Sequence, residues 1–141
     1  MNAKDFLETV LKKRRKVRRM EESLAAHTAR AESVTGLRLG EKVQTSAQST
    51  IDGTLAALEE ERSRLEEAQK ELEDMTARGK ELINLIRDDE TAWQILWERF
   101  IVGETWGSIA RKMNYGRATV VRLANAGIDA INEKMRRHET S

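Results

Sequence analysis

Two stretches of the chain place their apolar residues at alternating steps of four and three, the spacing that keeps one face of a helix against a partner helix. The first stretch has this repeat at Phe6, Val10, Lys13, Val17, Met20, Leu24, His27, Ala31 and Val34, and Leu7 and Leu11 widen it. The second has it at Ile51, Leu55, Leu58, Arg62, Leu65, Gln69, Leu72, Thr76, Gly79, Ile83 and Ile86, and Met75 and Leu82 broaden it. Proline would interrupt such helices, and the 141 residues contain none. The pattern therefore predicts two long helices and an all-α fold.

Residues 36–50 lose the repeat and are rich in glycine, serine, threonine and glutamine, which is typical of a loop. Thr35 and Gly36 supply a suitable helix end before it. Two heptad segments joined by a loop of about fifteen residues favour an antiparallel pair; the alternative is one continuous helix that only shields other core. Polar residues in the second seam leave pairing between two chains, a homodimer, open as well. We predict a long, coiled-coil-like helical hairpin over residues 1–87.

A basic block lies inside the first heptad segment and consists of Lys12, Lys13, Arg14, Arg15, Lys16, Arg18 and Arg19. In an antiparallel hairpin this block lies beside roughly residues 66–80, which hold Glu66, Glu67, Glu71, Glu73 and Asp74. Such pairs set helix orientation more than stability, because an exposed ion pair contributes only about 0–1 kcal/mol. The charges point all round a helix, so only some of them can face the acidic partner. The block is interpreted either as a solvated, internally paired surface or as a secondary contact with DNA phosphates.

The pattern changes at Asp88, where the heptads stop and the first of three tryptophans soon follows. Acidic residues at 88–90 suit a helix N-terminus because they oppose the helix dipole. An apolar face then recurs at helical spacing, at Trp93, Leu96, Trp97 and Phe100, and Gly103 is expected to end this helix. The next helix is predicted to follow the N-cap Thr105, with an apolar face at Trp106, Ile109, Ala110 and Met113. A third helix is predicted from about Arg117, with Val120, Leu123, Ala124, Gly127 and Ile131 on one side.

The last two of these helices meet the requirements of a helix-turn-helix. Ala110 is small where the two helices must cross closely, and Asn114 stands four residues on, where this turn usually has glycine. Asparagine tolerates the left-handed conformation that a tight turn needs. The apolar positions around the crossing are filled by Ile109, Met113, Tyr115, Val120 and Leu123. We predict a three-helix, helix-turn-helix DNA-binding domain over residues 88–141; the alternative is an ordinary αα-corner without a role in DNA binding.

The outward face of the third helix carries side chains that can recognise DNA. Arginine pairs bidentately with guanine and asparagine with adenine, and the residues expected to face outward are Arg117, Ala118, Val121, Arg122 and Asn125. Three more side chains suit phosphate contacts: Arg111, Lys112 and Thr119. The alternative for Arg117 and Arg122 is a solvated helix surface. Charge is polarised along the chain, with seven Lys or Arg against four Asp or Glu from residue 103 onward, and seven against fourteen over residues 51–102.

Composition argues against several other classes of protein. The formal net charge is +1, so a case for nucleic-acid binding rests on where the charges lie. There is no cysteine, and His27 and His138 are the only imidazoles, so we expect no structural metal, no cofactor and no histidine-based active site. The carboxylates are many, but none has an apolar setting and a partner that the sequence identifies, so we expect no enzyme. No apolar run approaches the roughly 20 residues that span a bilayer, and the expected location is the cytoplasm of a bacterial host.

The stretch LWERFIVGETWGSIARKMNYGRATVVRL resembles the region-four helix-turn-helix of sigma factors. It is more similar still to short phage-encoded late-gene transcription regulators of the ArpU/RinA-like group, through Leu96, Arg99, Phe100, Ile101, Gly103, Trp106, Ile109, Ala110 and Tyr115. Val43-Gln44-Thr45-Ser46 stands where that group has Val-Gln-x-Ser. Phe100 replaces the usual tyrosine, and Gly116 replaces a serine whose hydroxyl could have touched phosphate. The resemblance implies promoter binding and activation of prophage late genes.

The leading hypothesis is a sequence-specific regulator of transcription that binds double-stranded DNA, whose hairpin positions a second copy or touches RNA polymerase. A phage DNA-packaging protein similar to a terminase small subunit is the alternative, and it would form a ring of eight or more subunits. A coiled-coil adaptor whose basic block binds an acidic protein is a third class. It would fail to bind any DNA at low salt, where non-specific binding is strongest.

Overall fold

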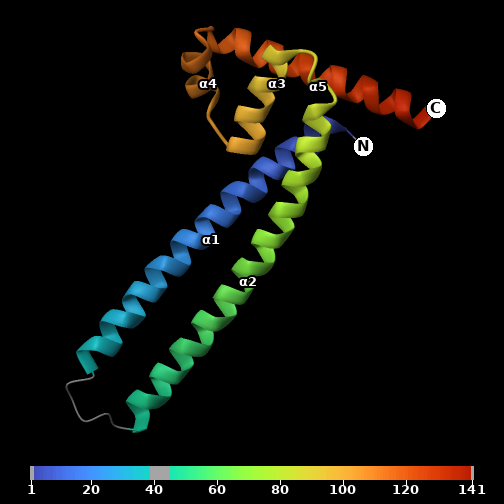
Figure 1. Ribbon diagram of the computed structural model, residues 1–141. Coiled ribbons are helices and arrows are strands. Elements are labelled where there is room, and N and C mark those ends of the chain that lie inside the picture. The colour runs from blue at the N-terminus through green and yellow to red at the C-terminus, as the bar shows by residue number, and fades with distance from the viewer. Residues whose placement is uncertain (1, 39–44, 141) are drawn as a thin grey trace. The chain divides into compact units, whose positions relative to one another are not determined.

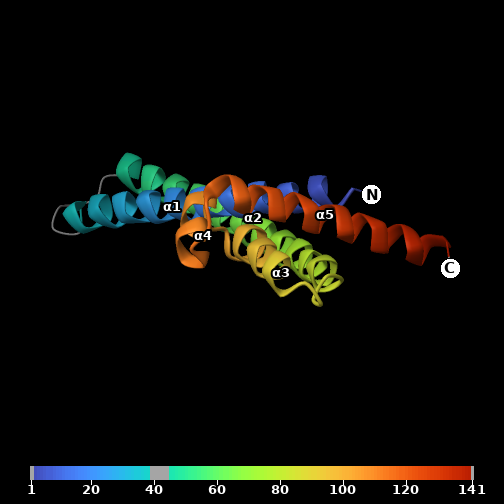
Figure 2. The same ribbon diagram turned by 90° about the horizontal axis from the view of Figure 1, so that it is seen from above.

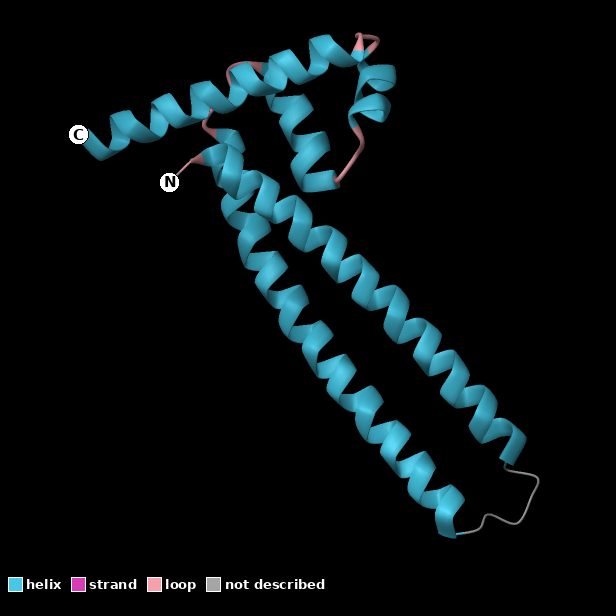
Figure 3. Cartoon of the chain, turned by 180° about the vertical axis from the view of Figure 1, so that it is seen from behind, coloured by secondary structure: helices cyan, strands magenta, loops and turns pink. Residues whose placement is uncertain are grey.

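The structure is a computed structural model that describes residues 2–38 and 45–140, with side-chain positions for residues 2–33 and 51–138. The described residues form helices and short connections, and no strand occurs among them (Figure 3). The all-α prediction is therefore confirmed. In chain order the helices are α1 (Ala3–Arg38), α2 (Thr45–Asn84), α3 (Glu90–Leu96), the π-helix η1 (Trp97–Val102), α4 (Trp106–Met113) and α5 (Arg117–Thr140) (Figure 1).

The long helices α1 and α2 run antiparallel, as the two heptad segments predicted (Figure 1). Both extend into the expected loop of residues 36–50: α1 continues through Arg38 and α2 begins at Thr45. Gly36 does not end α1, because a glycine inside a helix costs only about 1 kcal/mol relative to alanine. Residues 39–44, with Val43 and Gln44 of the Val-Gln-Thr-Ser element, lie outside the described part of the chain.

The chain divides into two compact units, and the division differs from the predicted domain boundary between residues 87 and 88. One, here named the hairpin unit, is Arg15–Glu71. The other, named the core unit, combines Met1–Arg14 with Leu72–Ser141. The start of α1 and the last part of α2 thus pack with the C-terminal helices, because apolar side chains from all of them share one core.

The seam of the hairpin unit follows the heptads of α1 except at His27, which is exposed, and departs from those expected in α2. Val17 is only 3% exposed, while Met20, Leu24 and Ala31 are half-buried. In α2 the buried residues are Leu58, Leu65 and Ala68. Three expected seam residues, Leu55, Arg62 and Gln69, are instead exposed, and Glu61 and Ala68, which precede the last two, take the inward positions. The expected register was wrong there: Ala68 is smaller than Gln69, which stays hydrated, while Glu61 is itself charged and turns inward to contact His27 and Ser23.

Polar contacts across the hairpin unit gather at the inward-turned Glu61. Its carboxylate lies 2.8 Å from Nδ1 of His27 and accepts a hydrogen bond of 3.2 Å from the Ser23 hydroxyl. The His27 contact is the main cause that lowers the pKa of Glu61. One heptad further on, the Gln69 amide donates to the Glu21 carboxylate at 3.1 Å. Specific polar pairs thus replace apolar contacts where the seam is weakest.

The core unit packs side chains from every one of its helices around one apolar centre. α5 crosses α3 and α4 and contacts both (Figure 1, Figure 2). The crossing with α3 is close at Gly127, where an added Cβ would lie 3.1 Å from Cβ of Ala92. The largest fully buried side chains of the unit are Leu7, Val10, Leu82, Ile83, Ile95, Leu96, Ile109, Val120 and Ile131.

Two polar side chains of α5 tie the start of α1 and the segment after α2 into this unit. The Asn132 side-chain oxygen accepts the Ala3 backbone N–H at 2.8 Å, at the start of α1. The Lys134 ammonium donates to the Leu85 carbonyl at 2.6 Å and to the Asp88 carboxylate at 3.1 Å, just after α2 ends. A cation there satisfies carbonyls that a helix end leaves unpaired. Among the described residues, no helix combines the length and the apolar character that crossing a membrane requires.

Candidate nucleic-acid interface

The segment that leads into α4 is held by local capping contacts. The Asp89 carboxylate accepts the Ala92 N–H at 3.2 Å, so Asp89 is the N-cap of α3. The helix expected to run unbroken to Gly103 changes to a π-helix at Trp97, and the N–H groups of Gly103 and Glu104 both bond to the Glu98 carbonyl. Gly103 ends it with φ +92°, a conformation open to glycine.

Thr105 is the N-cap of α4, as predicted, since its hydroxyl accepts the Ser108 N–H at 3.1 Å. Arg99 fixes the approach to this cap: its guanidinium lies 4.5 Å from the centre of the Trp106 ring and donates to the Glu104 carbonyl at 3.1 Å. A cation over an indole and a backbone hydrogen bond together join η1 to the start of α4. The start of α4 is therefore held in place by contacts with the residues that precede it.

The turn between α4 and α5 has the left-handed residue that the sequence predicted. Asn114 adopts the left-handed conformation, with φ 59° and ψ 41°. The Tyr115 N–H bonds back to the Ala110 carbonyl at 3.0 Å, which closes the end of α4. The Gly116 carbonyl then accepts the Val120 N–H at 3.1 Å and starts α5. These backbone hydrogen bonds end α4 and begin α5, so the chain changes direction at Asn114, Tyr115 and Gly116.

The apolar side of this corner is buried as the spacing predicted, with one exception. Ile109, Ala110, Val120 and Ala124 are buried, and Met113 and Leu123 pack against them, half-buried. Gly127 and Ile131 also face inward. Tyr115 was expected among these residues and is 44% exposed, so that assignment was wrong. In the turn its ring points partly to solvent, where the phenol stays hydrated.

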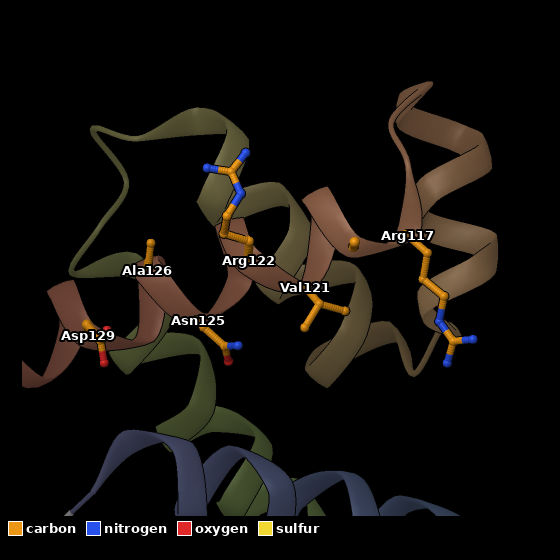
Figure 4. A pocket seen from close by; sticks show the side chains of 7 residues that line it. Arg117, Val121, Arg122, Asn125, Ala126 and Asp129 are labelled. Carbon is orange, nitrogen blue, oxygen red and sulfur yellow. The ribbon is translucent and has the colours of Figure 1, made fainter.

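The opposite side of α5 presents the predicted DNA-contacting residues on one surface, here named the recognition face: Arg117, Ala118, Val121, Arg122 and Asn125 (Figure 4). All five are exposed except Val121, which is half-buried, as is Thr119 beside them. The prediction that these side chains point away from the core is confirmed. With Ala126 and Asp129 they line a shallow, open hollow. Those two residues were not predicted from the sequence, although Asp129 follows Asn125 by one helical turn.

The flanking cations differ in how their charges are compensated. Arg111 is exposed, whereas the Lys112 ammonium lies 3.3 Å from the Glu98 carboxylate and 3.7 Å from that of Glu104. The contact with Glu98, and then the charge of Glu104, raise the pKa of Lys112. The pKa of Glu104 is lowered, chiefly by the hydrogen bond from Ser108 and then by Lys112. Of the two cations among the candidate phosphate contacts, Arg111 is therefore the better placed.

The basic block of α1 divides into packed and exposed members. Arg14 is half-buried: its guanidinium donates to the Thr76 hydroxyl at 3.1 Å, and its side chain lies beside Gly103. Lys13 is also half-buried. The exposed members are Lys12, Arg15, Lys16, Arg18 and Arg19. Arg14 thus has a packing role, and the five exposed members form no ion pair with the described acidic residues expected beside them: Glu66, Glu67, Glu71, Glu73 and Asp74.

Comparison of the chain with protein-family models, with curated proteins and with solved structures finds no match. Within the described residues, no three histidine, aspartate or glutamate side chains converge in a way that could hold a metal ion. The arrangement that stands out chemically is the recognition face, where an amide and small apolar groups lie between the guanidinium groups of Arg117 and Arg122, which point apart (Figure 4).

Proposed function

We propose that this protein is a sequence-specific, double-stranded-DNA-binding regulator of transcription. One observation carries the proposal: the α4–α5 corner buries Val120 and Ala124 while leaving Arg122 and Asn125 exposed on the other side of α5 and Arg117 exposed at its first residue. In helix-turn-helix proteins the second helix lies in the major groove and its first turns contact base edges. The N-terminal half of α5 supplies those contacts here.

Each residue of the recognition face has a partner in the major groove. The guanidinium groups of Arg117 and Arg122 pair with O6 and N7 of guanine, and the Asn125 amide pairs with N6 and N7 of adenine. Val121 and Ala118 contact the methyl group of thymine. Arg111 and Thr119 bind phosphates and fix the register of α5 on the duplex. Asp129 accepts a hydrogen bond from N4 of cytosine and disfavours an approach of phosphate to that end of the face.

The resemblance to phage late-gene regulators indicates which genes this DNA binding would regulate. It supports binding at promoters, with activation of prophage late genes in a bacterial cytoplasm and contact with RNA polymerase. Gly116 lacks the hydroxyl found in that group, so the phosphate contact at the start of α5 relies on backbone N–H groups, which point at an anion there. The protein then acts by binding and not by catalysis.

The test is the effect of Arg122→Ala on a duplex that the wild-type protein selects from a random library. Removing one bidentate interaction weakens binding by about 1–3 kcal/mol and relaxes the preference at one base pair. Arg136→Ala is the matched control, because Arg136 is exposed on the same helix and lies 2.9 Å from the Glu133 carboxylate. Unchanged affinity of Arg122→Ala for the selected duplex would show that the recognition face does not read bases.

A further inference from the structure

Four exposed cations surround one buried residue in the hairpin unit. Val17 is 3% exposed and faces α2, and the four side chains around it all point to solvent. They are Arg15, Lys16, Arg18 and Arg19, here named the α1 cluster. Arg15 and Arg19, spaced i, i+4, lie on the side of α1 opposite Val17, and Lys16 and Arg18 flank that side. The cluster is thus one continuous basic surface.

No member of the α1 cluster forms an ion pair with another described residue. Other cations of the hairpin unit do: Arg62 lies 3.3 Å from Glu59, and Arg64 lies 3.7 Å from Glu60. The cross-helix contacts next along α1 use Glu21 with Gln69, and His27 with Glu61. Neighbouring like charges without partners repel one another, so the cluster lowers helix stability and calls for a partner outside the fold.

We infer that the α1 cluster is a second DNA-binding surface, which contacts phosphates without regard to sequence. The inference rests on the proposed function, because that function identifies DNA as the polyanion that the cluster binds. Protein interfaces have a core of aromatic and apolar side chains, whereas the one apolar residue within the cluster, Val17, is buried. A helix lying on a membrane needs an exposed apolar stripe, which this side of α1 lacks. Interfaces with DNA are polar and strongly positive, as this surface is.

The acidic side chains of α2 limit how a duplex can approach the hairpin unit. Glu59, Glu60, Glu66 and Glu67 are exposed on α2. They repel phosphates, so a duplex meets the unit from the α1 side. Contacts of this kind release counterions and make the affinity depend on salt, independently of base sequence. The α1 cluster then contributes affinity, and the recognition face contributes preference.

The experiment compares the full-length wild type with the variant R15Q/K16Q/R18Q/R19Q on the selected duplex and on a duplex of random sequence. Removing one phosphate interaction lowers the slope of log K against log salt by about 0.9, so removing all four lowers it by about 3.6. The wild type should therefore show about a 150-fold greater fall in affinity than the variant between roughly 50 and 200 mM salt. The change should be equal on both duplexes.

Two further variants separate a direct phosphate interaction from net charge and from misfolding. R62Q/R64Q/K70Q/R78Q removes the same charge from α2 and should keep the wild-type slope. R15K/R18K/R19K keeps the charge of the cluster and should also keep the wild-type slope. Circular dichroism checks that all variants retain their helices.

The inference is overturned if a folded R15Q/K16Q/R18Q/R19Q protein keeps the wild-type slope, or if the α2 control shows an equal decrease. It is also overturned if the cluster variant binds anionic phospholipid vesicles or polyglutamate more weakly than the wild type but binds DNA equally well. Failure of the proposed function looks different, because the wild type would then select no preferred sequence from the random library.

Discussion

Asn114 shows how one residue sets the geometry of the candidate interface. Its φ of 59° lies in the left-handed region, which costs most L-residues about 1–2 kcal/mol. Asparagine and glycine tolerate it, and the sequence signal for the turn rested on this chemistry. Other residue-scale predictions were confirmed for the same reason: Thr105 caps α4 and Gly103 ends η1 through contacts within a few residues. Local chemistry of this kind is visible in a sequence.

Replacement of Asn114 tests this conformation directly. Asn114→Ala should lower the free energy of unfolding by about 1 kcal/mol, because alanine pays the left-handed penalty, while Asn114→Gly should cost little or nothing. Urea denaturation followed by tryptophan fluorescence measures both. Equal decreases in the two variants would mean that the side chain of Asn114, and not its backbone conformation, holds the turn.

At the scale of elements, the helices were predictable and their packing was not. Heptad spacing predicted α1 and α2, and apolar faces predicted α3, α4 and α5. The seam of α2 shifted to Glu61 and Ala68 because burial is decided by the partner helix, which a spacing rule does not contain. The first residues of α1 joined the core unit through contacts such as Asn132 with Ala3, which are distant in sequence. A heptad repeat does not reveal where one packing unit ends.

The dependence of the C-terminal helices on the start of α1 leads to a mutational test. Leu7 is fully buried in the core unit, so Leu7→Ala should lower the free energy of unfolding by about 2–5 kcal/mol. All three tryptophans belong to this unit and should report the destabilisation in urea. Leu55→Ala is the control: Leu55 is 55% exposed, and its removal should cost under about 1 kcal/mol. An unchanged tryptophan transition in Leu7→Ala would show that the C-terminal helices fold without α1.

Over the whole molecule, a formal net charge of +1 hides two separate basic surfaces. The recognition face belongs to the core unit, and the α1 cluster to the hairpin unit. The sequence predicted the recognition face because helical spacing separates its residues from buried ones. It left the role of the basic block open, because which cations pair inside the fold depends on side-chain positions, as Arg14 with Thr76 illustrates.

The central claim is that α5 contacts base edges in the major groove through Arg122. The most direct measurement replaces each guanine of the selected duplex in turn by 7-deazaguanine, which lacks the N7 acceptor. At one position the substitution should weaken wild-type binding by about 1–2 kcal/mol and leave Arg122→Ala unaffected. Equal sensitivity of both proteins at every guanine, or none in the wild type, would contradict the claim.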